Sequence, residues 1–272
     1  MARVALPQSR LKARRRARRL RLVIIVIGFI LLAALGAVAL SYAPFWRIST
    51  IVVMGAESIA TSTVQAFVQE ELKGSHALIF PKDNILLYPK ASLQRDILAE
   101  FPAVRSVVLR AQNFSTVEVE LLERKPHALW CGNERAGTNS CFLLDDSGVA
   151  YESALSFTGS AYTQYYGATV ANGALRQYLT EEKFNSLDAL VIALAQKVQN
   201  DSLLYVAVDS LDDVRVGFGS GFVLIFSSKD DGADIYQRFE LTLTSEPFKS
   251  RALSDFEYLD LRFGDKLYYK LK

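Results

Sequence analysis

The sequence predicts an α+β protein with one transmembrane helix, then a β-α-α-β-β module and a mostly antiparallel β domain with flanking helices. Three observations support this prediction. An uncharged apolar run lies near the N-terminus, two helical stripes of apolar residues lie between β-branched segments, and short alternating segments fill the second half. With 50% hydrophobic and 22% charged residues among 272, the chain is too apolar to be disordered.

Residues 1–21 form a basic tail that we expect to stay in the cytoplasm. The tail carries nine Arg and Lys residues and no acidic one, whereas the rest of the chain carries 22 basic and 29 acidic residues. The acidic remainder would repel phosphate, so the composition predicts no nucleic-acid partner. A cluster of positive charge directly before an apolar run is typical of the cytoplasmic side of a membrane helix.

Residues 22–42 are predicted to cross a lipid bilayer once. Leu22–Leu40 comprises nineteen residues without a charge, and a helix of that length spans about 28 Å, close to the ~30 Å hydrocarbon core. A cleaved signal peptide has a shorter apolar run. Aromatic residues at Tyr42, Phe45 and Trp46 are typical of a membrane interface. We therefore expect a single-pass protein of the cytoplasmic membrane whose later residues lie outside the cytoplasm.

Residues 43–125 are predicted to form the first exterior module. A β-branched strand at 48–53 ends at Gly55, and two helices follow, capped near 61–63 and near Ser92. Strands at 104–111 and 116–123 complete the module. In the last strand Val117, Val119 and Leu121 alternate with glutamates, which predicts one buried face. The two helices carry apolar stripes that would cover it: Val64, Phe67, Val68 and Leu72, then Leu93, Ile97 and Phe101.

Residues 126–272 are predicted to form a second, mostly β module. The expected strands lie at 127–130, 142–144, 149–151, 203–208, 213–218, 221–226, 257–263 and 266–271, and the expected helices at 181–198 and 233–244. Residues 156–178 are rich in Gly, Ala and Tyr and give no clear prediction.

No motif for catalysis, a cofactor or a metal is recognisable, so we do not expect an enzyme or a small-molecule substrate. His76 and His127 are the only histidines and lack partners at metal-ligand spacing. The sequence contains no G-x-S-x-G nucleophile motif. The paired aspartates at 145–146, 212–213 and 230–231 flank turns, where Asp is favoured for local hydrogen bonds.

Five segments together resemble the FtsQ/DivIB family of bacterial cell-division proteins: "FWRISTIVV" from Phe45, "FPAVRSVVLR" from Phe101, "STVEVELLERKPHALW" from Ser115, "LLDDSGVAYE" from Leu143 and "YLDLRFG" from Tyr258. The resemblance covers nearly the whole chain in the same order. It implies a POTRA domain over 43–125 and an FtsQ/DivIB-like β domain over 126–272. It also implies a bitopic scaffold at the division septum, with FtsB/DivIC-like and FtsL-like coiled-coil proteins as partners.

Two other functions remain open. POTRA domains also serve machinery that assembles membrane proteins, which suggests a chaperone of membrane-protein assembly. A membrane-anchored exterior enzyme is the second alternative, because one sequence can hide a pair of catalytic carboxylates.

Cys131 and Cys141 are disulfide candidates. They flank a loop between two strands that we expect to pair, on the side of the membrane where disulfides persist. Two independent buried thiols are the alternative.

The last two predicted strands are the candidate partner-binding site. The chain ends at Lys272, so we expect the final strand to be a sheet edge. The family resemblance implies that this edge receives a strand from the coiled-coil partner. Phe263 and Tyr269 would be aromatic anchors, and Arg262, Lys266 and Lys270 would attract an acidic partner. The full candidate set is Tyr258, Arg262, Phe263, Lys266, Tyr268, Tyr269 and Lys270. The alternative is that Leu259, Leu261 and Phe263 fill the core and the terminal lysines protect the edge from aggregation.

Overall fold

The computed structural model describes residues 8–76, 79–133, 135, 140–154, 162–167, 170–172, 175–198 and 201–272. The chain divides into two compact units, described separately below. The N-terminal unit contains the chain up to Glu100 together with Ser106–Leu122, and the C-terminal unit contains Phe101–Arg105 and Glu123–Lys272. The fold is mixed α+β, with a large unit that consists mostly of sheet.

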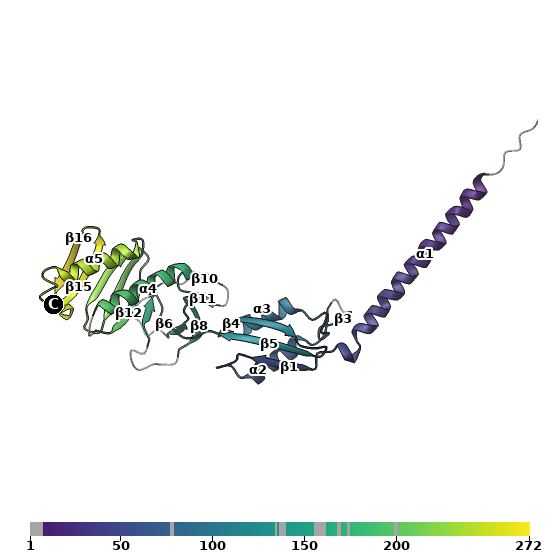
Figure 1. Ribbon diagram of the computed structural model, residues 1–272, viewed down its shortest axis with the longest axis horizontal. Helices are drawn as coiled ribbons and strands as arrows, with labels where there is room; N and C mark the ends of the chain where they lie inside the picture. Colours follow the sequence, from purple (N-terminus) through teal and green to yellow (C-terminus); the bar gives the residue numbers. More distant parts are fainter. Residues whose placement is uncertain are drawn as a thin grey trace, which may run out of the picture. The chain divides into compact units, whose positions relative to one another are not determined.

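A single helix, α1 (Gln8–Ser41), contains both the described part of the basic segment and the apolar run (Figure 1). Residues 1–7 of the predicted tail lie outside the described residues. From Arg16 to Ser41 the helix is long and apolar enough to cross a membrane, with a mean hydropathy of 3.1 over its most apolar window. Its large aliphatic side chains are exposed, as contact with lipid requires. The helix is consistent with a single-pass membrane protein.

The N-terminal unit has the predicted β-α-α-β-β order with a small extra sheet. Its main sheet has the order β1-β5-β4, and β1 runs parallel to β5. Two-residue strands β2 and β3 pair between the helices. The elements are the 3₁₀ turn η1 (Pro44–Trp46), β1 (Thr50–Met54), α2 (Thr61–Glu71), β2 (Ser75–His76), β3 (Phe80–Pro81), α3 (Lys90–Glu100), β4 (Val104–Ala111) and β5 (Thr116–Glu123).

Apolar side chains at helical and alternating spacing build the core of this unit. The predicted dry face of β5 is buried at Val117, Val119 and Leu121. The helices contribute Val64, Val68, Leu72, Leu93 and Ile97, whereas Phe67 and Phe101 are only half-buried. The predicted caps are wrong in detail. Ala60 is the N-cap of α2 and makes no side-chain cap bond, and α3 begins at Lys90, before Ser92.

The C-terminal unit is built on one sheet of eleven strands in the order β10-β11-β8-β7-β6-β9-β12-β13-β14-β15-β16. Most neighbours are antiparallel, and the β6–β9, β9–β12 and β14–β15 pairs are parallel. The strands are β6 (Ala128–Trp130), β7 (Phe142–Leu144), β8 (Val149–Ser153), β9 (Gln164–Tyr166), β10 (Val170–Asn172), β11 (Leu175–Gln177), β12 (Leu203–Val208), β13 (Asp213–Phe218), β14 (Val223–Ser227), β15 (Phe256–Phe263) and β16 (Lys266–Leu271).

Two helices cover one face of this sheet. The helix α4 (Glu181–Lys197) lies where a helix was predicted and buries Phe184, Leu187, Val191 and Leu194, and α5 (Gly232–Thr244) buries Ile235 and Phe239. Asp231 caps α5, because its side chain accepts a hydrogen bond from the backbone N–H of Ala233. The core under the helices includes strand residues such as Trp130, Val206, Val214, Leu224 and Leu259. A 3₁₀ turn, η2 (Leu253–Asp255), leads into β15.

Strands β9, β10 and β11 come from the tract that gave no prediction. Each has only three residues, too few to show an alternating pattern. Within this tract, residues 156–161, 168–169 and 173–174 lie outside the described residues.

Candidate functional site

The predicted terminal edge exists, because β16 is the last strand of the eleven-stranded sheet and, among the described strands, pairs with β15 alone. The pairing is antiparallel and places Tyr268 opposite Asp260 and Tyr269 opposite Leu259. All six residues of β16 are exposed. In β15, Leu259 and Leu261 are buried, so their interpretation as core residues is confirmed, whereas Phe263 is 52% exposed.

The two faces of β16 differ in chemistry. Leu267, Tyr269 and Leu271 lie on the face that carries the helices, because Tyr269 is opposite buried Leu259 and successive side chains alternate. The Tyr269 ring contacts the rings of Phe248 and Phe256 edge-on, at centroid distances of 5.3 and 5.8 Å.

The other face of β16 carries Lys266, Tyr268 and Lys270. Here Tyr268 packs edge-on against Phe263, with 5.0 Å between the ring centroids. Tyr258 is half-buried and lies opposite Lys270. The two predicted anchors, Phe263 and Tyr269, therefore belong to different aromatic groups on different faces.

The free edge presents backbone groups at alternate residues of β16. The backbone N–H of Lys272 donates to the carbonyl of Asp255, 3.0 Å away, so residue 272 faces β15. Because the direction of the N–H and C=O groups alternates along a strand, residues 270 and 268 also face β15. Leu267, Tyr269 and Leu271 then direct their N–H and C=O groups outward. An incoming strand can pair with these groups.

Arg262 is held within its own domain. Its guanidinium group donates to both carboxylate oxygens of Asp260, with Nε–Oδ1 at 2.9 Å and Nη2–Oδ2 at 2.6 Å, and it also pairs with Asp213 of β13. Burial alone would raise the pKa of Asp260, but the hydrogen bonds from Arg262 outweigh burial and lower it. Arg262 thus links β15 to the start of β13, and both carboxylates compensate its charge.

The turn between β15 and β16 is fixed from the helix side by Arg238 of α5. Its Nη1 donates to the carbonyls of Leu261 at 2.7 Å and Gly264 at 3.3 Å, and its Nη2 donates to Asp230 at 2.8 Å. Gly264 has a φ of +61°, which glycine adopts without strain. Neither the sequence spacing nor a motif predicts this role of Arg238, because Arg238 and the turn are distant in the sequence and come together only in the folded protein.

The lysines at positions 266, 270 and 272 differ in whether their charge is available to a partner. Lys270 forms an ion pair with Glu257, and Lys272 donates to the carbonyl of Ser220 at 2.7 Å. Lys266 is exposed at the start of β16. Among the cations predicted to attract an acidic partner, Arg262 and Lys270 are thus engaged inside the domain.

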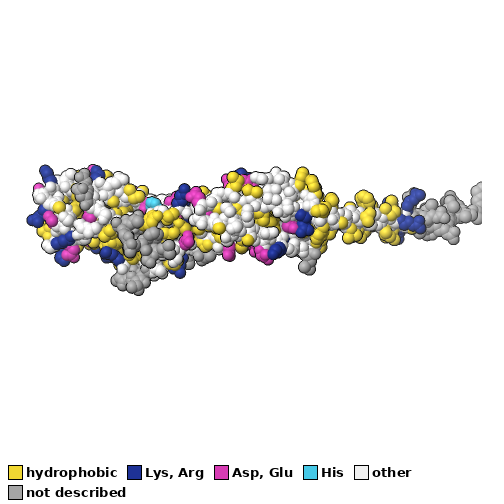
Figure 2. Space-filling model, turned by 90° about the horizontal axis from the view of Figure 1, so that it is seen from below, with side chains coloured by type: hydrophobic (Ala, Val, Ile, Leu, Met, Phe, Trp, Pro, Cys, Tyr) yellow, Lys and Arg dark blue, Asp and Glu magenta, His cyan; other side chains and the backbone are white. Residues whose placement is uncertain are grey.

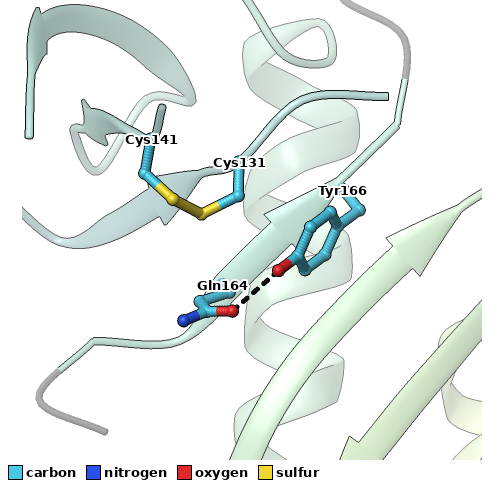
Figure 3. The surroundings of a disulfide bond; sticks show 4 residues. All are labelled: Cys131, Cys141, Gln164 and Tyr166. Atoms are coloured by element: carbon cyan, nitrogen blue, oxygen red, sulfur yellow. Dashed lines mark hydrogen bonds between the residues drawn. A yellow bond between two sulfur atoms is a disulfide. The ribbon is translucent and has the colours of Figure 1, made fainter. Parts of the chain in front are cut away.

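Cys131 and Cys141 form a disulfide next to the central strand β9 (Figure 3). Cys131 follows β6 and Cys141 precedes β7, and these strands pair as predicted. The bridge borders a small apolar cluster of Leu129, Cys131, Tyr166 and Tyr205. Alternation along β6 places Leu129 on the face opposite to Trp130 and the helix-covered core. Tyr166 donates a hydrogen bond to Gln164 within β9, at 2.8 Å.

Two polar clusters of the C-terminal unit join residues that are distant in sequence. His127 Nε2 lies 2.9 Å from Asp188 Oδ2, and Tyr165 donates to Asp188 Oδ1 at 2.6 Å. The hydrogen bond to Asp188 raises the pKa of His127, which partial burial opposes.

Arg124 and Asp145 form a nearly buried ion pair. Asp145 also accepts from the backbone N–H groups of Ser147 and Val149, which agrees with its predicted place at a turn.

No family model matches this chain, and no curated protein does. Within the described residues, no group of three or more His, Cys, Asp or Glu side chains is placed to hold a metal ion.

Proposed function

We propose that this protein is a bitopic membrane scaffold of the FtsQ/DivIB type, which links division proteins at the septum through its exterior domains. The observation that carries the proposal is the exposed terminal strand β16. It offers outward backbone groups at Leu267, Tyr269 and Leu271, and the side chains of the same residues form an apolar stripe, each about two-fifths exposed. A partner strand would gain main-chain hydrogen bonds and cover that stripe.

The partner that fits this edge is a short strand next to the coiled coil of a single-span protein of the FtsB/DivIC or FtsL type. A strand with apolar residues at every second position would extend the helix-covered face of the sheet beyond Tyr269. Acidic residues on its other face would lie near Lys266 and Tyr268. Arg262 and Arg238 act as positioning residues in this proposal, because their bonds hold β15 and the turn.

The N-terminal unit has the role of the POTRA domain in this proposal. Its β-α-α-β-β order and its three-stranded sheet with β1 at one edge support that assignment. The basic segment directly before the apolar run of α1 supports a cytoplasmic N-terminus. A reporter that is active only in the cytoplasm is expected to be silent when fused after Lys272, and activity there would contradict the orientation.

A pull-down of the tagged full-length chain from solubilised membranes tests the scaffold. Recovery of single-span coiled-coil proteins is the expected result. Recovery of β-barrel proteins instead would favour a chaperone of membrane-protein assembly. Hydrolytic activity that is lost in an Asp188→Asn variant would favour an exterior enzyme, because Asp188 joins His127 and Tyr165.

A further inference from the structure

An exposed apolar patch lies on the N-terminal unit where α1 ends. Its aromatic part consists of Phe45, Trp46 and Phe114, whose ring centroids are 4.9 to 5.2 Å apart. Phe45 is 61% exposed and Phe114 is 53% exposed, although 68 residues separate them in the chain. Leu86 and Leu87 are exposed in the loop before α3. Figure 2 shows hydrophobic side chains gathered where α1 meets the folded part of this unit.

Hydrogen bonds tie the leucine loop to the end of α1. The side-chain amide of Asn84, which is buried, donates to the carbonyl of Ser41, the last residue of α1, at 2.8 Å. The backbone N–H of Ile85 donates to the carbonyl of Trp46 at 2.8 Å, and Arg47 forms an ion pair with Asp83. The loop therefore cannot move away from the helix end without breaking several polar contacts.

We propose that Phe45, Trp46, Leu86, Leu87 and Phe114 form a bilayer-contacting surface, which holds the N-terminal unit against the leaflet from which α1 emerges. The proposal rests on α1 crossing the membrane, and it does not depend on a role in cell division. Continuity with α1 identifies the occupant, because a patch tied to the last turn of a membrane helix lies at the depth of the lipid headgroups. Aromatic rings are favoured at that depth.

The contribution of Phe114 separates this surface from a simple interfacial anchor. Tyr42, Phe45 and Trp46 follow the apolar run directly and would lie near the interface even on a flexible stalk. Phe114 precedes β5, and Leu86 and Leu87 precede α3, so these side chains reach the bilayer only if the folded unit itself lies on it. Apolar side chains of this kind enter the boundary between headgroups and acyl chains.

Labels on single cysteines of the full-length chain test the proposal. Both native cysteines are in the disulfide, so one introduced cysteine takes the label. The variants Phe114→Cys and Leu86→Cys carry a fluorophore, and the protein is reconstituted into phosphatidylcholine–phosphatidylglycerol vesicles with and without nitroxide-labelled acyl chains. The matched control is Leu122→Cys. Leu122 is also exposed, but it lies at the other end of β5, roughly 26 Å away by strand geometry.

The expected result is at least a threefold stronger quenching of the labels at positions 86 and 114 than of the label at position 122. Equal quenching at 114 and 122, or none at 114, would overturn the proposal. A label in Leu31→Cys, within α1, reports insertion separately. Quenching at 31 without quenching at 114 refutes the docked surface and leaves the membrane span intact, and the septal scaffold is judged by its own pull-down.

Discussion

Replacing Leu271 by proline tests the outward edge of β16 at a single hydrogen-bond donor. Lys272 donates to Asp255 across the ladder, so the N–H of Leu271 points away from β15. Proline at that position removes an outward donor and leaves the β15–β16 ladder complete, which edge strands tolerate. The variant Leu271→Ala is the matched control, because it removes the same side chain and keeps the N–H.

The size of the effect follows from one lost hydrogen bond at a buried interface. A net hydrogen bond contributes about 0.5–1.5 kcal/mol, and leaving the partner's carbonyl unpaired costs about 1–3 kcal/mol. The proline variant is therefore expected to bind about 1–3 kcal/mol more weakly than the alanine variant, a roughly 5- to 150-fold higher Kd. The alanine variant itself loses only the contribution of a side chain that is 40% exposed in the free protein.

The assay is quantitative recovery of the coiled-coil membrane proteins that we expect to copurify with the tagged full-length chain. The free energy of unfolding of both variants must first lie within about 0.5 kcal/mol of that of the unchanged protein, as expected for a surface substitution. Trp130, which is buried in the C-terminal unit, reports that unfolding by its fluorescence. Equal recovery with the proline and alanine variants would refute strand addition at this edge, even if both variants recover less than the unchanged protein.

Three further predictions concern the C-terminal unit. Asp145→Ala leaves Arg124 buried without its partner, so we expect a loss of about 3–5 kcal/mol in the free energy of unfolding, measured in urea. The unreduced protein is expected to be 2 Da lighter than the reduced one. Reducing Cys131–Cys141, which closes a loop with a sequence separation of 10, is expected to cost at most about 3 kcal/mol. Folding raises the pKa of His127, so its stabilising contribution is complete below the unfolded value of about 6.5 and is lost as pH rises through the folded value. In the variant His127→Gln, the free energy of unfolding measured across that pH range is expected to lose this pH dependence. An unchanged pH dependence would contradict the contribution of His127.

The long elements could be predicted from the sequence because their patterns are local. The apolar spacing in α4 and the alternation in β5 are each visible within one element, and the residues that carry them are buried. The edge position of β16 was also expected, and the sheet order confirms it.

The site's supporting contacts could not be predicted because they depend on long-range geometry. Arg262 and Asp213 are 49 residues apart, and Arg238 and Gly264 are 26 residues apart, so no spacing rule connects them. From the sequence alone, Arg262 is interpreted as a cation available to a partner. In the structure, Arg262 instead pairs with carboxylates of its own domain. Strand β9 could not be predicted for another reason, because its three residues are too few to show an alternating hydrophobic pattern.

Strand β9 also determines how the large sheet can open. It lies between the five strands that end at β6 and the five that begin at β12, and its register with β6 joins only two residue pairs. The backbone ladder is therefore as thin at this seam as between β8 and β11, which also share two residue pairs, while the side-chain core extends across the seam from Trp130 to Val206. In native-state amide exchange, a block such as β12–β16 can stay protected while a neighbouring block opens. Cooperativity across the sheet would then depend on α4 and the packed side chains, and the edge at β16 would persist through fluctuations that separate the strands beyond β9.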